Sequence, residues 1–112
     1  MNLSEIMKKQ AEFDKAHAGR SEWGEAVTVG NLQLLEHELV CLLGEIGEFA
    51  NVVKKTIRGD LTYQDAKPQL VEELTDTFIY LIKLCNSLGM DLESAFSDRL
   101  NFNWQRFKQF EK

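Results

Sequence analysis

Apolar residues recur every three or four positions along most of the chain, which is the spacing of one face of an α-helix. The pattern predicts four helices, over approximately residues 3–17, 31–58, 66–88 and 91–112. A glycine-rich loop, AGRSEWGEAVTVG at 18–30, separates the first two, and Gly59 and Gly89 end the second and third. Because the sequence has a single proline and lacks long β-branched runs, we expect an all-α protein.

Helix start signals accompany these boundaries. Asn31 and Asp91 have the short polar side chains that cap helix N-termini, so each is predicted to begin a helix. Pro68 is predicted to lie in the first turn of the third helix, where a backbone N–H is not needed. Each helix carries one apolar stripe, which predicts a four-helix bundle. In the second helix the stripe is Leu35, Leu39, Leu42, Ile46, Phe49, Val53 and Ile57.

With 112 residues, 44% of them hydrophobic, the chain has the size and composition of a single domain spanning residues 1–112. A bundle this small that also builds a functional site often gains core by self-association, so we expect a homo-oligomer. Cys41 and Cys85 lie in apolar segments without metal-ligand spacing and are expected to be free thiols in a reducing compartment. The charged N-terminal segment and the absence of any stretch of roughly 20 apolar residues predict a cytoplasmic protein without membrane contact.

The formal net charge of −5 argues against binding of a nucleic-acid polymer, because contacts to a phosphate backbone favour a basic surface. The same charge is compatible with a single nucleotide. A divalent cation can screen phosphate groups from carboxylates, so an acidic pocket holding Mg²⁺ suits a triphosphate.

Two pairs of acidic residues stand beside the apolar stripes of the long second and third helices. Glu45 and Glu48 are three residues apart, and Glu73 and Asp76 repeat this spacing on the next helix. In each pair one carboxylate lies at the margin of the stripe and the other beside it on the same flank. If the two helices pack antiparallel with these flanks facing, four carboxylates converge. Glu72 points about 160° from the centre of the stripe, towards solvent.

Four converging carboxylates are the ligands that hard divalent cations prefer, and without cations they would repel one another. A four-helix di-iron site would require Glu-x-x-His, which neither His17 nor His37 supplies, so magnesium is favoured over iron. A solvated helix face remains the alternative for either pair alone. Gly44 and Gly47, which precede the two glutamates, either permit tight helix packing or admit a ligand close to the backbone.

The segments that carry these acids resemble the MazG family, the all-α nucleoside triphosphate pyrophosphohydrolases related to dimeric dUTPases and dCTP pyrophosphatases. The resemblance covers about residues 32–107 and rests on Glu-x-x-Glu in LLGEIGEFANVVKK and Glu-x-x-Asp in LVEELTDTFIYL. Family members also carry a basic residue, an asparagine four positions later and an arginine three beyond it. RLNFNWQR matches this pattern through Arg99, Asn103 and Arg106, with arginine where many relatives have lysine.

The resemblance implies a four-helix bundle completed by self-association into a homodimer or homotetramer. It implies hydrolysis of (deoxy)nucleoside triphosphates to monophosphate and pyrophosphate, with nucleotide-pool cleansing as the expected role. The ion is expected to be Mg²⁺, with Mn²⁺ as a substitute, held by Glu45, Glu48, Glu73 and Asp76. Either of the first pair is a candidate catalytic residue, and Glu48, the carboxylate furthest from the core, is the expected general base.

Arg99, Asn103 and Arg106 follow i, i+4, i+7 spacing and share a helix face, so they are expected to bind the phosphates together. Lys55 is a further candidate, although a helix C-terminus attracts cations in any case. Trp23 and His17 are possible contacts for a base, but a lone tryptophan more often packs a loop onto a core. The alternative functions are an inactive nucleotide-binding module and an oligomerising helical bundle.

Overall fold

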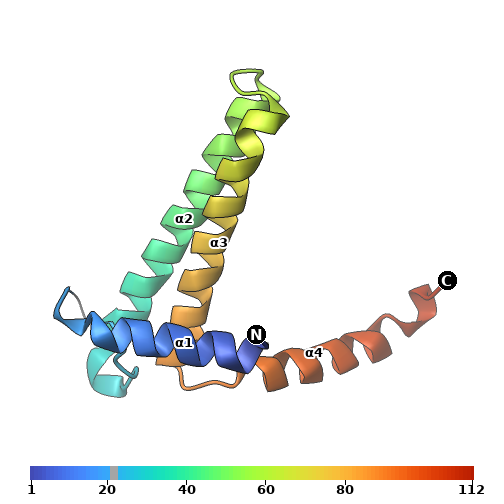
Figure 1. Cartoon of the computed structure of the whole chain (residues 1–112). Helices are drawn as coiled ribbons and strands as arrows, with labels where there is room; N and C mark the ends of the chain where they lie inside the picture. The colour runs from blue at the N-terminus through green and yellow to red at the C-terminus, as the bar shows by residue number, and fades with distance from the viewer. Residues whose placement is uncertain (21–22) are drawn as a thin grey trace.

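Figure 1 shows the computed structural model of the chain, which describes residues 1–20 and 23–112. These residues form helices and connecting turns, without a strand, so the all-α prediction is confirmed. Ser21 and Glu22 of the predicted loop lie outside the described residues. The α-helices are α1 (Leu3–Ala16), α2 (Gln33–Ile57), α3 (Tyr63–Ser87) and α4 (Leu92–Arg106), and the short 3-10 turns are η1 (Ala18–Arg20), η2 (Val29–Asn31) and η3 (Lys108–Phe110).

Two helix starts differ from the prediction. Asn31 does not cap α2, because its side chain is engaged in η2, where it accepts a hydrogen bond from the backbone N–H of Thr28. Helix α3 begins three residues earlier than expected, since the Thr62 side chain accepts a hydrogen bond from the backbone N–H of Asp65. Pro68 therefore lies inside the helix rather than in its first turn. The predicted cap of α4 is confirmed: the Asp91 carboxylate accepts from the backbone N–H of Ser94.

Helices α2 and α3 form a long antiparallel hairpin, and α1 crosses its open end (Figure 1). Helix α4 packs against α1 near its start and then leads away from the hairpin. Where α1, α3 and the start of α4 meet, Met7, Ile82 and Cys85 form a small buried core. Both cysteines are free, and Cys85 is buried as a small hydrophobic residue would be.

Much of the predicted core is not buried within one chain. In α2, Leu39, Ile46 and Ile57 are exposed, and the buried positions are Leu34, Glu38 and Val52. Beyond the first turn of α4, the large apolar side chains of the helix and of its C-cap residue are exposed, namely Phe96, Leu100, Phe102, Trp104 and Phe107. None of the three buried positions of α2 belongs to its predicted stripe, so the stripe does not mark the face that the same chain covers.

The dimensions of the molecule also show that the chain is less compact than a typical single domain. The radius of gyration is 17.3 Å, whereas a compact domain of this length has about 13 Å. The accessible surface is 8277 Å², and a folded monomer of this mass typically has about 6,300 Å². None of the helices in the described residues carries an apolar stretch of the length that a membrane crossing requires.

Candidate metal centre

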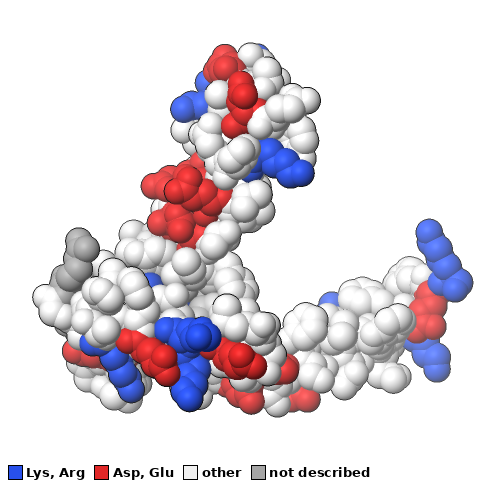
Figure 2. Space-filling view, viewed as in Figure 1, with Lys and Arg blue, Asp and Glu red and all other residues white. Residues whose placement is uncertain are grey.

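Three carboxylates converge midway along the hairpin. Glu45 of α2 and Glu73 and Asp76 of α3 each offer an oxygen, and these oxygens lie within 4.8 Å of one another. The i, i+3 spacing places Glu73 and Asp76 on one flank of α3, and the antiparallel packing turns that flank towards Glu45. Figure 2 shows acidic side chains gathered at this level of the hairpin. Glu72, the neighbour of Glu73, is exposed, as the helical spacing predicts.

Two oxygens of this cluster lack hydrogen-bond partners. Among the described residues, Glu45 Oε2 and Glu73 Oε2 are buried and accept no hydrogen bond. Buried polar atoms are normally paired, because an unsatisfied oxygen has lost its water without gaining a donor. Oxygens of this kind, close together and all from carboxylates, fit the preferences of a hard divalent cation.

The carboxylates of the cluster repel one another, because their charges have the same sign. Burial raises the pKa of Glu45, and the charges of Glu48 and Asp76 raise it further. Burial likewise raises the pKa of Glu73, and the charges of Glu48, Glu45 and Asp76 raise it further. Glu48, the fourth predicted carboxylate, affects both pKa values, but it lies outside the group of three converging oxygens and is exposed to solvent. A bound cation would replace this mutual repulsion by attraction.

The surface of α2 beside the cluster is open. Beyond the adjoining helix backbone, a methyl group added at Gly44 or Gly47 would meet no atom of the described residues within 4 Å. Tight helix packing within one chain therefore does not account for these glycines. The open surface leaves room for a ligand or for another chain.

A groove with aromatic walls borders the cluster on the side of α1. It has a volume of about 300 Å³ and is lined by Gln10, Phe13, Trp23, Ile79, Tyr80 and Lys83. Tyr80 follows Asp76 by about one turn of α3. Burial raises the pKa of the Tyr80 hydroxyl, and the neighbouring Cys41 and Glu45 raise it further.

Sequence reasoning missed a buried polar network behind this groove. The Lys83 ammonium lies 3.1 Å from a carboxylate oxygen of Asp14, and both side chains are buried. On the next turn of α3, Ser87 donates a hydrogen bond to Glu38 of α2. Burial raises the pKa of Glu38, whose other oxygen has no partner among the described residues. The available signal was weak: each residue is an ordinary charge on a helical pattern.

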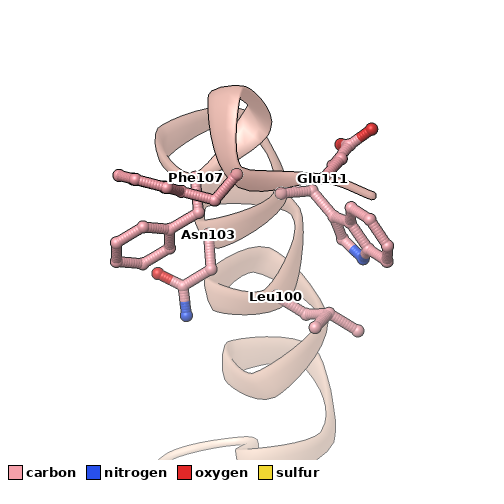
Figure 3. A pocket seen from close by; sticks show the side chains of 6 residues that line it. Leu100, Asn103, Phe107 and Glu111 are labelled. Atoms are coloured by element: carbon pink, nitrogen blue, oxygen red, sulfur yellow. The ribbon is translucent and has the colours of Figure 1, made fainter.

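The three predicted phosphate-binding residues of α4 do not lie at the cluster of their own chain, because α4 leads away from the hairpin (Figure 1). The guanidinium groups of Arg99 and Arg106 instead pack over the ring of Phe102. Asn103 has a buried side-chain oxygen without a hydrogen-bond partner in the described part of the chain. It lines an apolar pocket of about 270 Å³ at the end of α4, together with Leu100 and Phe107 (Figure 3).

Lys55 lies exposed in the last turn of α2, where it complements the helix dipole. Nearby Arg58 is engaged in an ion pair of 2.6 Å with Asp60. Lys55 is therefore the more available of the two for an anionic ligand at the closed end of the hairpin. His17 stacks on Phe13, with ring centroids 4.2 Å apart, and so belongs to the aromatic surroundings of the groove.

Residues 33–109 match the family model of the MazG nucleotide pyrophosphohydrolase domain. The chain belongs to this family. The match includes the four predicted carboxylates and the three polar residues of α4, whereas α1 and the loop with Trp23 precede it. The resemblance inferred from the motifs is thereby confirmed, and the all-α architecture agrees with it.

Several curated proteins are similar to this MazG domain. The proteins named dCTP pyrophosphatase 1 of Homo sapiens, Rattus norvegicus and Mus musculus are each 30% identical to it over 109 residues. These similarities cover 94% of the chain but 58% of each relative, so the chain spans little more than half their length. No solved structure matches the chain at a significant level.

Proposed function

We propose that this MazG domain hydrolyses (deoxy)nucleoside triphosphates to nucleoside monophosphate and pyrophosphate in a Mg²⁺-dependent reaction. The observation that carries the proposal is the convergence of Glu45, Glu73 and Asp76, with orphaned oxygens, beside an aromatic groove. Membership of the family supports it. The names of the similar mammalian proteins also agree with it.

Glu45, Glu48, Glu73 and Asp76 would hold the cation. Their donor set consists of carboxylates alone, which favours Mg²⁺, with Mn²⁺ as a substitute, over ions that prefer imidazole or thiolate. When bound, such an ion supplies neutralisation of phosphate charge and a lowered pKa of water.

Glu48 is the proposed general base. It is the exposed carboxylate of the four, so a water molecule can reach it from solvent. Its charge acts on Glu45 and Glu73, which supports a role in which it would accept the proton of the attacking water. Glu45, the other catalytic candidate of the pair, is half-buried.

The groove is proposed to bind the nucleoside. A triphosphate at the level of Asp76 would extend its sugar and base along α3 towards Tyr80 and Lys83, which lie one and two turns further on. Aromatic walls formed by Phe13 and Trp23 suit a planar base. The domain therefore has one acidic end for the phosphates and one apolar end for the base.

The phosphate-binding residues of α4 require a second copy of the chain. Arg99, Asn103 and Arg106 can complete the site only if α4 of one protomer lies against the hairpin of its partner. The accessible surface exceeds that of a typical monomer by about 2,000 Å², more than one partner contributes to a standard protein interface. We propose a homodimer or homotetramer, in which Lys55 is a further contact for phosphate. The proposed setting is cytoplasmic, and the proposed role is nucleotide-pool cleansing.

A panel of nucleoside triphosphates tests the proposal. Each is incubated with the protein and Mg²⁺, and ion chromatography separates pyrophosphate from orthophosphate. Pyrophosphate and monophosphate are expected in equal amounts, and EDTA should abolish their release. Orthophosphate as the first product would contradict the assignment. Absence of turnover, together with no effect of Mg²⁺ on the melting temperature, would favour a catalytically inactive module.

A further inference from the structure

The buried ammonium group of Lys83 lies against Trp23, one of the aromatic side chains that line the groove. The Lys83 ammonium is 3.6 Å from the centroid of the Trp23 ring and 3.1 Å from a carboxylate oxygen of Asp14. Lys83 is 6% exposed and Asp14 is 4% exposed, so water does not screen the pair. The Gln10 amide donates a further hydrogen bond of 3.0 Å to the same oxygen of Asp14. The ammonium is therefore fixed in position by groups from α1.

Trp23 has the Lys83 ammonium over its ring. It belongs to the connection between α1 and α2, where the described residues form only two 3-10 turns. The Trp23 ring also lies near the ring of Phe13. The two rings are tilted relative to each other, and their centroids are 6.4 Å apart. The next residue, Gly24, has a φ of +81° and packs against Lys15, which turns the chain at this point. A cation against the ring face defines the plane of the indole more sharply than apolar packing alone.

A purely stabilising role does not explain this arrangement. A buried ion pair loses its hydration, and apolar residues of similar volume often stabilise a fold as well or better. What the ion pair adds here is a fixed point charge under an indole that remains only half-buried. Asp14 also neutralises the ammonium, so the groove does not attract the phosphates that the acidic end of the site is proposed to hold.

We propose that Lys83, held by Asp14, is a positioning residue that sets the plane of Trp23 as the surface on which the base of the substrate stacks. The inference rests on the proposed nucleotide function. Lys83 would act through Trp23, without touching the reacting phosphates. It should therefore control the KM for the nucleotide and leave the kcat nearly unchanged.

A double-mutant cycle tests whether Lys83 acts through Trp23. Lys83→Met keeps much of the side-chain length and removes the charge, and it should raise KM about tenfold, within the range of a desolvated cation–π contact. In a Trp23→Ala background the same change should alter KM less than about twofold, because coupled residues are not additive. Equal effects in both backgrounds, or a fall in kcat at constant KM, would overturn the proposal. Lys83→Arg retains a stacking cation and should restore most of the affinity.

A binding measurement separates this inference from the proposed reaction. Tryptophan fluorescence is titrated with nucleoside monophosphates without metal, and the Trp23→Phe variant identifies the part of the signal that Trp23 contributes. Wild type should be quenched, and Lys83→Met should need about tenfold more ligand. If no triphosphate is hydrolysed but this shift appears, the reaction is wrong and the positioning role stands. If Lys83→Met does not fold, Asp14→Asn releases the ammonium and should weaken quenching. Unchanged quenching in that variant would refute the role.

Discussion

Glu72 and Glu73 are adjacent on α3, yet the helix gives them different surroundings. Glu73 lies in the cluster with a buried, unpaired oxygen, whereas Glu72 is exposed to solvent. The difference follows from the rotation of about 100° per residue along an α-helix. Because the spacing alone determines this separation, the sequence was sufficient to choose between the two acids.

Substitution of these neighbours provides a matched pair of variants. Glu73→Gln should lower kcat/KM at least about a hundredfold, because a catalytic cation contributes several kcal/mol and each 1.4 kcal/mol is a factor of ten. Glu72→Gln removes the same charge one residue away and should change kcat/KM less than about twofold. Both are measured by pyrophosphate release at saturating Mg²⁺. Comparable losses in the two variants would mean that net charge, rather than ligation, is responsible.

The raised pKa values of Glu45 and Glu73 predict how stability depends on pH. Their pKa values lie above the usual 4.5 in the folded state, so folding favours their protonated forms. The stabilisation is complete below the unfolded pKa and is lost as the pH rises through the folded pKa. The metal-free protein should therefore become less stable towards urea as the pH rises from about 4.5 to neutrality.

Two controls assign this dependence to the cluster. Saturating Mg²⁺ should flatten it, because a cation favours the ionised carboxylates. Glu73→Gln should also reduce it in the metal-free protein. Burial also raises the pKa of Glu38. Glu38 therefore contributes a pH dependence of stability of the same sign, which Mg²⁺ should leave unchanged. Stability that increased with pH in the metal-free protein would show that the carboxylates do not repel one another.

The burial of Lys83 and Asp14 could not be predicted from the sequence. From the sequence, each is expected to be exposed, because most charged residues on helices are exposed. Their burial depends on where α1 crosses α3, which no local pattern contains. The carboxylate pairs were predictable because both members of each pair belong to one helix.

At the scale of the elements, helix ends were predicted where the cap is local. Asp91 caps α4 through a neighbouring N–H, and the sequence was enough to identify it. Asn31 also has a short polar side chain, but its oxygen accepts a hydrogen bond from Thr28 in the preceding turn, η2. Thr62 offered a competing start for α3, and the longer helix accommodates Pro68 in its interior. Competition between nearby caps is decided by the path of the loop, which periodicity does not describe.

The glycines of α2 give a prediction at this scale. A methyl group at Gly44 or Gly47 would have open space among the residues that the structure describes, so alanine should add helix propensity without a clash. Each substitution should stabilise the isolated chain by about 0.5–1 kcal/mol. Urea unfolding at low protein concentration measures this, with Ala50→Gly as the reverse control on the same helix. A loss of stability would show that another chain packs against these glycines even in dilute solution.

At the scale of the whole molecule, the apolar stripes predicted how much surface must be covered but not which chain covers it. The large apolar side chains of α4, among them Phe96, Trp104 and Phe107, remain exposed, and so do Leu39 and Ile46 on the hairpin. Two unpartnered apolar faces on one molecule can cover each other in a symmetric pair. Helical periodicity is identical for contacts within and between chains, so the sequence could not distinguish them.

Mixing two inactive variants tests whether α4 completes the site of a partner. Glu73→Gln disables the hairpin, and Arg99→Ala disables α4, so each should be inactive alone. If α4 acts across the interface, a mixed dimer has one site with both defects and one with neither. An equimolar mixture that exchanges randomly should then recover about a quarter of the wild-type activity. Sedimentation must show dimers or larger species in every sample. Recovery should follow subunit exchange, and a mixture that stays inactive while mixed dimers form would show that α4 does not supply the partner's site.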